Sequence, residues 1–141
     1  MRLCGAFAAK MKYISLFENV TRTHVKDCII KEDRLIFVIP KKQVVLALGK
    51  RGENIKRLKE LYKRNIDIIG FSPEVEEFVR NIFHNFKIKA VRVESRGEKS
   101  LVVVEVDLRD KGKIIGKNGS NLKLAREIVC RHFEINDIII S

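Results

Sequence analysis

One eight-residue segment occurs twice in this chain, and that repetition constrains the fold more than any other feature. Residues 49–56 read GKRGENIK, and residues 116–123 read GKNGSNLK. The copies lie 67 residues apart, about half of the 141-residue chain, and the apolar segments 35–39 and 102–106 match at the same offset. A repeat of this length indicates two structural units of one kind, each built around one copy of the segment.

The first half of the chain has the apolar spacing of a mixed helix and strand unit. Apolar residues recur at helical spacing over 6–18, Phe7 among them, which predicts an amphipathic helix. Runs rich in β-branched residues flank Lys31-Glu32-Asp33, which predicts a hairpin. The expected elements are a helix at 6–18, strands at 25–30 and 34–39, helices at 42–48 and 53–63, and a strand at 65–69.

The second half repeats that order. Ser72 and Pro73 predict a helix that has a serine cap and proline at its first position, and that runs to about Asn85. The remaining expected elements are strands at 90–94 and 100–107, helices at 110–115 and 120–133, and a strand at 135–140.

Each half is therefore predicted to have the order α-β-β-α-α-β. We expect an α+β, two-layer fold of two domains, 1–71 and 72–141, each with a small mixed three-stranded sheet. The join at 70–72 is too short to act as a flexible tether, so we expect the two domains to pack as one rigid body.

The Gly-Lys-x-Gly part of each copy falls between two expected helices. A helix N-terminus carries unpaired N–H groups and a partial positive charge, and both attract phosphate. Glycines at both ends of the turn let the backbone approach an anion closely, because they carry no side chain. A purely structural role, ending one helix and tightening a turn, accounts for a single copy but less well for lysine at the same place in both.

Basic residues outnumber acidic ones, 29 to 18, which gives a formal net charge of +11. This excess favours a polyanionic partner, because each basic group near a phosphate releases a condensed counterion. Residues 1–71 carry 16 basic and 7 acidic side chains, a net +9, whereas residues 72–141 carry 13 and 11, a net +2. The first half should supply most of the sequence-independent attraction.

Aliphatic side chains flank both turns, whereas tryptophan is absent and the other aromatic residues fall mainly on helical core faces. If nucleic acid binds, we therefore expect aliphatic packing and hydrogen bonds to base edges in place of aromatic stacking. The aliphatic residues beside the turns are Val45, Leu48 and Ile55 in the first half and Ile114, Ile115 and Leu122 in the second. Some of them must belong to the core, and those nearest the turn are the candidates to line a groove for bases.

The segments ALGKRGENIKRL at 47–58 and GKIIGKNGSNL at 112–122 resemble the type II KH domain. Two such units in close succession look like the archaeal-type NusA transcription termination/antitermination family. The resemblance covers essentially the whole chain and implies two RNA-clamping loops, 49–52 and 116–119. On this basis the candidate RNA-binding residues are Gly49, Lys50, Arg51, Gly52, Ile55, Lys56, Ile115, Gly116, Lys117, Asn118, Gly119, Leu122 and Lys123.

The same resemblance implies single-stranded RNA as the main partner and RNA polymerase or the transcription elongation complex as a second one. The longer bacterial members carry a polymerase-binding domain and an OB-type domain, for which 141 residues leave no room. KH pairs also occur in ribosomal and ribosome-assembly proteins. A ribosome-assembly factor and a polymerase-docking scaffold with weak RNA affinity therefore stand as alternatives.

Sequence motifs for enzymatic or metal chemistry are missing. The segment 112–118 is one residue short of a phosphate-binding P-loop and has Asn118 where Ser or Thr would bind magnesium. The three cysteines and three histidines are scattered without metal-ligand spacing. We therefore expect a non-enzymatic, cytoplasmic monomer that uses no cofactor, holds no metal and does not enter a membrane.

Overall fold

The computed structural model describes residues 3–141, with side chains from residue 8 onward, so the side chains of Cys4 and Phe7 lie outside the described part. The chain divides into two compact units, Met1–Phe71 (unit 1) and Ser72–Ser141 (unit 2). Each unit has its own three-stranded sheet.

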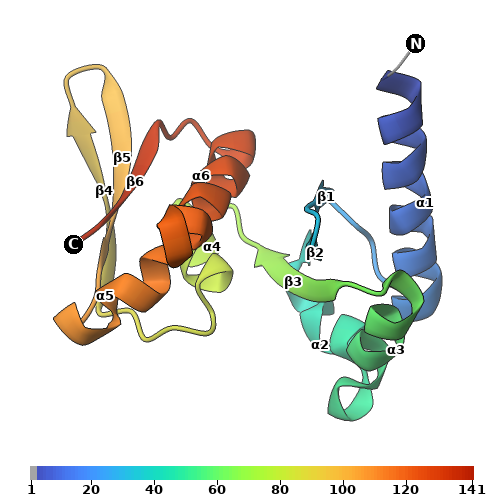
Figure 1. Ribbon diagram of the computed structural model, residues 1–141. Coiled ribbons are helices and arrows are strands. Elements are labelled where there is room, and N and C mark those ends of the chain that lie inside the picture. The colour runs from blue at the N-terminus through green and yellow to red at the C-terminus, as the bar shows by residue number, and fades with distance from the viewer. Residues whose placement is uncertain (1–2) are drawn as a thin grey trace. The chain divides into compact units, whose positions relative to one another are not determined.

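Unit 1 begins with a long helix, and two short helices follow between its second and third strands (Figure 1). The elements are α1 (Leu3–Thr21), β1 (Asp27–Ile30), β2 (Arg34–Pro40), α2 (Val44–Leu48), α3 (Glu53–Tyr62) and β3 (Asn65–Phe71). One 3-10 turn, Lys41–Gln43, precedes α2 and another, Lys50–Gly52, separates α2 from α3.

The sheet of unit 1 is mixed, in the order β1-β2-β3. β1 pairs antiparallel with β2, with Asp27 opposite Val38, and β2 pairs parallel with β3, with Arg34 opposite Asn65. Parallel neighbours cannot be joined by a tight turn, so the chain needs a crossover, which α2 and α3 provide. The turn Lys50–Gly52 therefore lies in the middle of this crossover.

The core of unit 1 lies between its sheet and the helices α1 and α3. Phe17 of α1 stacks on Phe37 of β2, with ring centroids 4.1 Å apart, and Leu58 of α3 is buried in the same cluster. At the end of α3, the Tyr62 hydroxyl donates a hydrogen bond to the backbone carbonyl of Tyr13. These contacts hold α3, and with it the turn before it, against the sheet.

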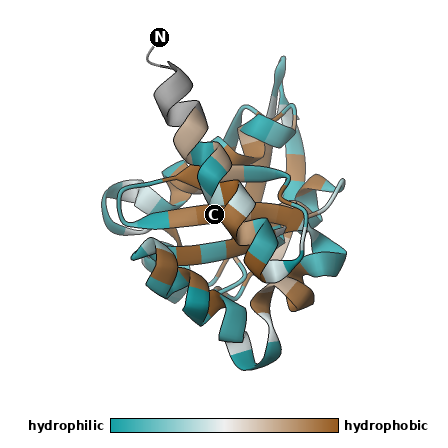
Figure 2. Ribbon diagram, turned by 90° about the vertical axis from the view of Figure 1, so that its right-hand side faces the viewer, coloured by the Kyte–Doolittle hydropathy of each residue, from teal (hydrophilic) through white to brown (hydrophobic). Residues whose placement is uncertain are grey.

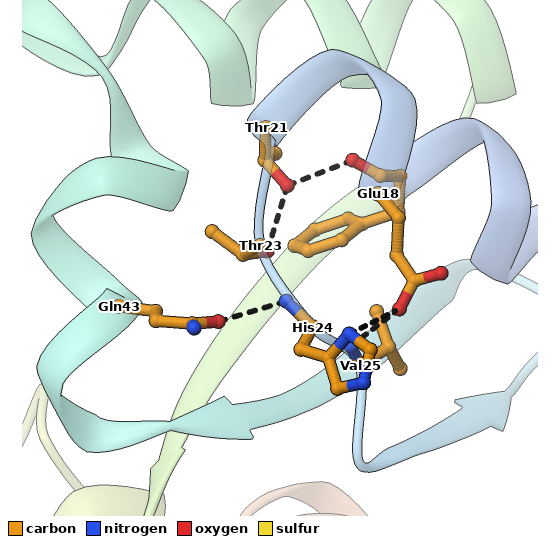
Figure 3. Close-up of polar contacts among 7 residues, drawn as sticks. Glu18, Thr21, Thr23, His24, Val25 and Gln43 are labelled. Atoms are coloured by element: carbon orange, nitrogen blue, oxygen red, sulfur yellow. Dashed lines mark hydrogen bonds and ion pairs between the residues drawn. The ribbon is translucent and has the colours of Figure 1, made fainter.

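A set of polar contacts fixes the connection that follows α1 (Figure 3). The Glu18 carboxylate accepts a hydrogen bond from the Val25 amide at 2.8 Å, and the Thr21 and Thr23 hydroxyls bond each other at 2.7 Å. The amide of His24 donates to the side-chain oxygen of Gln43 at 2.8 Å. Because Gln43 immediately precedes α2, this last contact also fixes where the crossover begins.

Unit 2 repeats the element order of unit 1. Its elements are α4 (Val75–Ile82), β4 (Ala90–Arg96), β5 (Lys99–Glu105), α5 (Leu108–Ile115), α6 (Ser120–His132) and β6 (Asp137–Ile140), with a 3-10 turn at Lys117–Gly119. The sheet order is β4-β5-β6, antiparallel and then parallel, so α5 and α6 form the matching crossover.

In unit 2, α4 packs on β4, α6 packs on β6, and the two helices contact each other. Phe78 is fully buried and its ring lies 5.5 Å from that of Phe133. Ala125, Ile128 and Val129 of α6 are also buried. In Figure 2 the strands are largely hydrophobic and the helices carry both colours, as expected for helices with one face on a sheet.

The fold class is the predicted one, an α+β arrangement with a mixed three-stranded sheet in each unit. Several predicted element bounds differ from the structure by two or three residues, among them the starts of α1, α2, α4 and α5. α4 begins at Val75, because the backbone of Glu74 is extended (φ −91°, ψ 120°) and leaves Pro73 outside the helix. That helix also ends at Ile82, short of Asn85, and the strand predicted at 100–107 ends at Glu105.

Candidate nucleic-acid interface

The first loop consists of Gly49, Lys50, Arg51 and Gly52, which lie between α2 and α3. Gly49 has φ 75° and ψ 174°, a conformation available essentially to glycine alone. The Gly52 amide donates to the Gly49 carbonyl at 3.2 Å, which closes the turn. The turn projects beyond the strands at the lower right of Figure 1.

The second loop, Gly116 to Gly119, has the same geometry. Gly116 has φ 80° and ψ 171°, and the Gly119 amide donates to the Gly116 carbonyl at 3.1 Å. The final glycines are also alike, with φ 70° and ψ 22° at Gly52 and φ 73° and ψ 17° at Gly119. The two sequence copies therefore form one loop shape twice, each ahead of a helix N-terminus that can attract an anion.

The third loop position has left-handed backbone in both units. Arg51 has φ 55° and ψ 30°, and Asn118 has φ 58° and ψ 25°. Asparagine adopts this conformation readily, whereas for arginine it is strained. Both side chains are exposed.

The predicted basic side chains around each loop are exposed to solvent. Lys50 and Lys56 are exposed in unit 1, and Lys117 and Lys123 are exposed in unit 2. Lys56 and Lys123 occupy the first turn of α3 and α6, and helical side chains lean back toward the N-terminus, which brings these two toward the loops. The structure thus gathers two lysines beside each loop.

The predicted aliphatic residues divide into two groups. Ile114 is fully buried and is one of the residues that belong to the core of unit 2. Val45 is 81% exposed. Leu48, Ile55, Ile115 and Leu122 are half-buried, which leaves part of each side chain open beside its loop.

The charge on the helix that follows the loop differs between the units. Exposed Lys59, within α3, and exposed Lys63, immediately after its end, continue the basic surface beyond Lys56. In unit 2 the position equivalent to Lys59 is Arg126, which forms an ion pair with Asp137 at 2.5 Å. The basic surface that leads away from the loop is therefore longer in unit 1.

The helix before the second loop has a defined start. Asp107 caps α5 by accepting a hydrogen bond from the Arg109 amide at 3.2 Å, and its carboxylate pairs with the Arg109 guanidinium at 3.3 Å. These contacts with Arg109 lower the pKa of Asp107 below its usual range. The carboxylate stays ionised as the acceptor of this cap.

Sequence reasoning gave no role to Asn54 and Asn121, although both recur at the 67-residue offset. The amide nitrogen of Asn54 donates to the Leu46 carbonyl at 3.3 Å, and that of Asn121 donates to the Lys113 carbonyl at 3.2 Å. Their recurrence was the only signal available, because the partners lie eight residues earlier, on the other side of the loop.

No group of three or more His, Cys, Asp or Glu side chains lies within the described part of the chain in a way that could hold a metal ion. None of the helices described in residues 3–141 combines the length and apolar character needed to cross a membrane.

Comparison with known protein families agrees with the loop geometry. Residues 12–72 match the KH domain model, and residues 75–141 match the model of the NusA-like second KH domain. The probable transcription termination protein NusA of Thermoplasma acidophilum is 32% identical over 131 residues, which cover 93% of this chain and 91% of that protein. The chain belongs to the NusA-like family.

Two further relatives support this assignment. The probable transcription termination protein NusA of Methanocaldococcus jannaschii is 30% identical over 89% of this chain and 68% of its own length. The crystal structure of APE1850 superimposes with a TM-score of 0.78, at 34% identity, over 95% of this chain and 99% of that one. Membership in the NusA-like family confirms two KH domains and a non-enzymatic transcription factor, and implies contact with RNA and the transcription machinery in general.

Proposed function

We propose that this NusA-like chain binds single-stranded RNA through its two loops and acts in transcription termination or antitermination. The residues assigned to RNA are Gly49, Lys50, Arg51, Gly52, Ile55 and Lys56 in unit 1, and Ile115, Gly116, Lys117, Asn118, Gly119, Leu122 and Lys123 in unit 2. RNA polymerase or the elongation complex is the proposed second partner.

The observation that carries this proposal is the repeated loop. Two segments of different sequence take the same backbone path, and both present glycine backbone and exposed basic side chains ahead of a helix. A phosphate can approach such a backbone closely, while half-buried Ile55 and Leu122 offer aliphatic surface to a base. Unpaired bases are required, because an RNA duplex hides their faces.

The direct test measures affinity for one RNA sequence in single-stranded and duplex form by fluorescence polarisation. The single strand should bind more tightly. The variants K50D/R51D and K117D/N118D should each remove RNA binding by one unit, because two carboxylates would face a phosphate. Both loops are exposed, so the free energy of unfolding should change by no more than about 0.5 kcal/mol.

The matched control for K50D/R51D is K87D/K89D, which makes the same charge change at two exposed lysines outside the loops. It should lower affinity only through net charge. Equal affinity for the duplex, or wild-type affinity in both loop variants, would contradict the proposal. The role in transcription is tested by adding the chain to a purified archaeal transcription system, where the wild type should change the fraction of terminated transcripts and a variant with both loops altered should not.

A further inference from the structure

Asn54 and Asn121 make the same contact in their two units. Each lies in the first turn of the helix after the loop and donates its side-chain amide to a carbonyl in the last turns of the helix before it, Leu46 or Lys113. A carbonyl oxygen only accepts, so the donor must be the amide nitrogen. α2 ends at Leu48 and α5 at Ile115, so these carbonyls belong to the groups that a helix end leaves without an intrahelical partner.

The asparagine side chains also occupy the space directly behind the first glycine of each loop. A Cβ atom on Gly49 would lie 2.8 Å from Cγ of Asn54 and 3.0 Å from its backbone nitrogen. A Cβ atom on Gly116 would lie 2.9 Å from Cγ of Asn121 and 3.0 Å from its backbone nitrogen. Each glycine and its asparagine therefore fit together as one packed pair.

We propose that Asn54 and Asn121 are positioning residues that hold the two loops in their anion-binding shape. This inference rests on the proposed function of the loops as RNA-binding elements. Each side-chain amide joins the end of the helix before the loop to the start of the helix after it. This bond fixes the direction in which the N-terminus of the following helix, α3 or α6, points. The loop also has backbone hydrogen bonds, such as those from the Gly52 amide to the Gly49 carbonyl and from the Glu53 amide to the Lys50 carbonyl, but these do not reach across to the preceding helix as the asparagine does.

This role differs from base recognition, the usual one for asparagine beside nucleic acid. An asparagine that reads adenine uses its amide nitrogen and oxygen together. Here one of the two amide hydrogens is already bonded to a backbone carbonyl, and the amide is packed against the first glycine of its loop, so we assign it to the loop and not to a base. Loss of either asparagine should therefore weaken binding of every RNA sequence by the same factor.

The experiment compares N54A, N121A and N54A/N121A with the wild type on oligo(A), oligo(C) and oligo(U) of equal length. Each single substitution should weaken binding about five-fold, the effect of one lost hydrogen bond, by the same factor on all three RNAs. N19A is the matched control, because Asn19 is an exposed asparagine of α1 far along the chain from either loop, and it should leave affinity unchanged.

A second readout follows the loop itself. In N54A, backbone ¹⁵N order parameters should fall at residues 50–52 and stay unchanged at 117–119 of the same molecule, and N121A should give the reverse. If N54A fails to fold, N121A tests the same claim in unit 2. Equal loss of order in both loops would indicate general destabilisation and overturn the positioning role.

The binding outcomes separate the two proposals. Wild-type RNA binding that survives unchanged in N54A/N121A overturns this inference and leaves the proposed function standing. A loss confined to oligo(A) also overturns it, because the asparagines would then read a base. A wild-type chain that binds none of the three RNAs overturns the proposed function together with the inference.

Discussion

At the third loop position, Arg51 and Asn118 share one backbone conformation and differ in side chain. A left-handed backbone costs a residue with a Cβ atom roughly 1–2 kcal/mol, and asparagine pays less of this than arginine. Unit 1 thus carries a strained residue that brings a positive charge, whereas unit 2 carries a relaxed, neutral one. The positive charge of Arg51 is thus present in unit 1 despite a backbone conformation that is strained for arginine.

Reciprocal substitutions at the third loop position test whether backbone strain accompanies the positive charge. R51N should raise the free energy of unfolding by about 0.5 kcal/mol and reduce the slope of log affinity against log salt by about 0.7, the share of one phosphate. N118R should do the opposite in unit 2. Urea denaturation and polarisation titrations at several salt concentrations measure both effects, and an unchanged salt slope in R51N would show that its guanidinium does not contact phosphate.

At the scale of whole elements, most of the fold could be predicted from apolar spacing, because the helices have an apolar face and each central strand contains a continuous apolar run. Leu35 to Ile39 of β2 are all buried, which is why that strand was clear from sequence. The start of α4 was missed because the Ser-Pro pair signals a helix start, whereas the extended backbone of Glu74 places it two residues later.

The candidate site was only partly predictable. The loops were visible as repeated glycines and lysines, yet the burial of Ile114 and the contact of Asn54 depend on how two helices meet across a turn. Spacing along one helix cannot give that geometry. Ile114 and Ile115 are neighbours in sequence, and only packing against the sheet decides that the first is buried and the second half-exposed.

The basic face of α3 gives a prediction for that element. Lys59 and Lys63 are exposed and form no ion pair with another described residue. K59A/K63A should lower RNA affinity. It should also reduce the slope of log affinity against log salt by up to about 1.4, the contribution expected from two phosphates. The control is R126A at the equivalent place in α6, which should lose its ion pair with Asp137 and leave the slope nearly unchanged. Equal slopes in K59A/K63A and wild type would show that RNA does not follow α3.

Tyr62 gives a pH-dependent prediction for the packing of α3 on α1. Burial raises the pKa of its phenol above the ordinary value near 10. The stabilisation is therefore complete below about pH 10 and is lost as the pH rises further, because the unfolded chain then releases the proton first. Y62F should lower the free energy of unfolding by about 1 kcal/mol at pH 7 through the lost hydrogen bond to Tyr13.

The measurement is the free energy of unfolding of wild type and Y62F from about pH 8 to 11. The difference between them should shrink toward the alkaline end. A constant difference would mean that the phenol ionises equally easily in the folded and unfolded chain.

At the scale of the molecule, salt and RNA length distinguish two paired loops from a generally basic surface. Two loops holding about four nucleotides each should neutralise roughly 4–6 phosphates, a slope of about −3 to −4 for single strands. Affinity should reach a plateau near ten nucleotides, because one strand then fills both units. A slope steeper than about −6, with affinity that keeps rising with length, would show that the net charge of +11 holds the RNA.

The closed turn of unit 2 also affects how fast the protein deamidates during storage. Asn118-Gly119 is the sole Asn-Gly pair in the sequence, and such pairs lose ammonia when the glycine nitrogen attacks the asparagine Cγ to give a succinimide that hydrolyses to aspartate or isoaspartate. In the folded loop that nitrogen donates to the Gly116 carbonyl at 3.1 Å, which holds it away from this attack.

Peptide mapping after warm storage should find slow conversion at Asn118 in folded protein and faster conversion in urea, whereas equal rates would show that the turn gives no protection. Arg51-Gly52 has no such chemistry, so an old preparation would acquire a negative charge in one loop and keep the other intact.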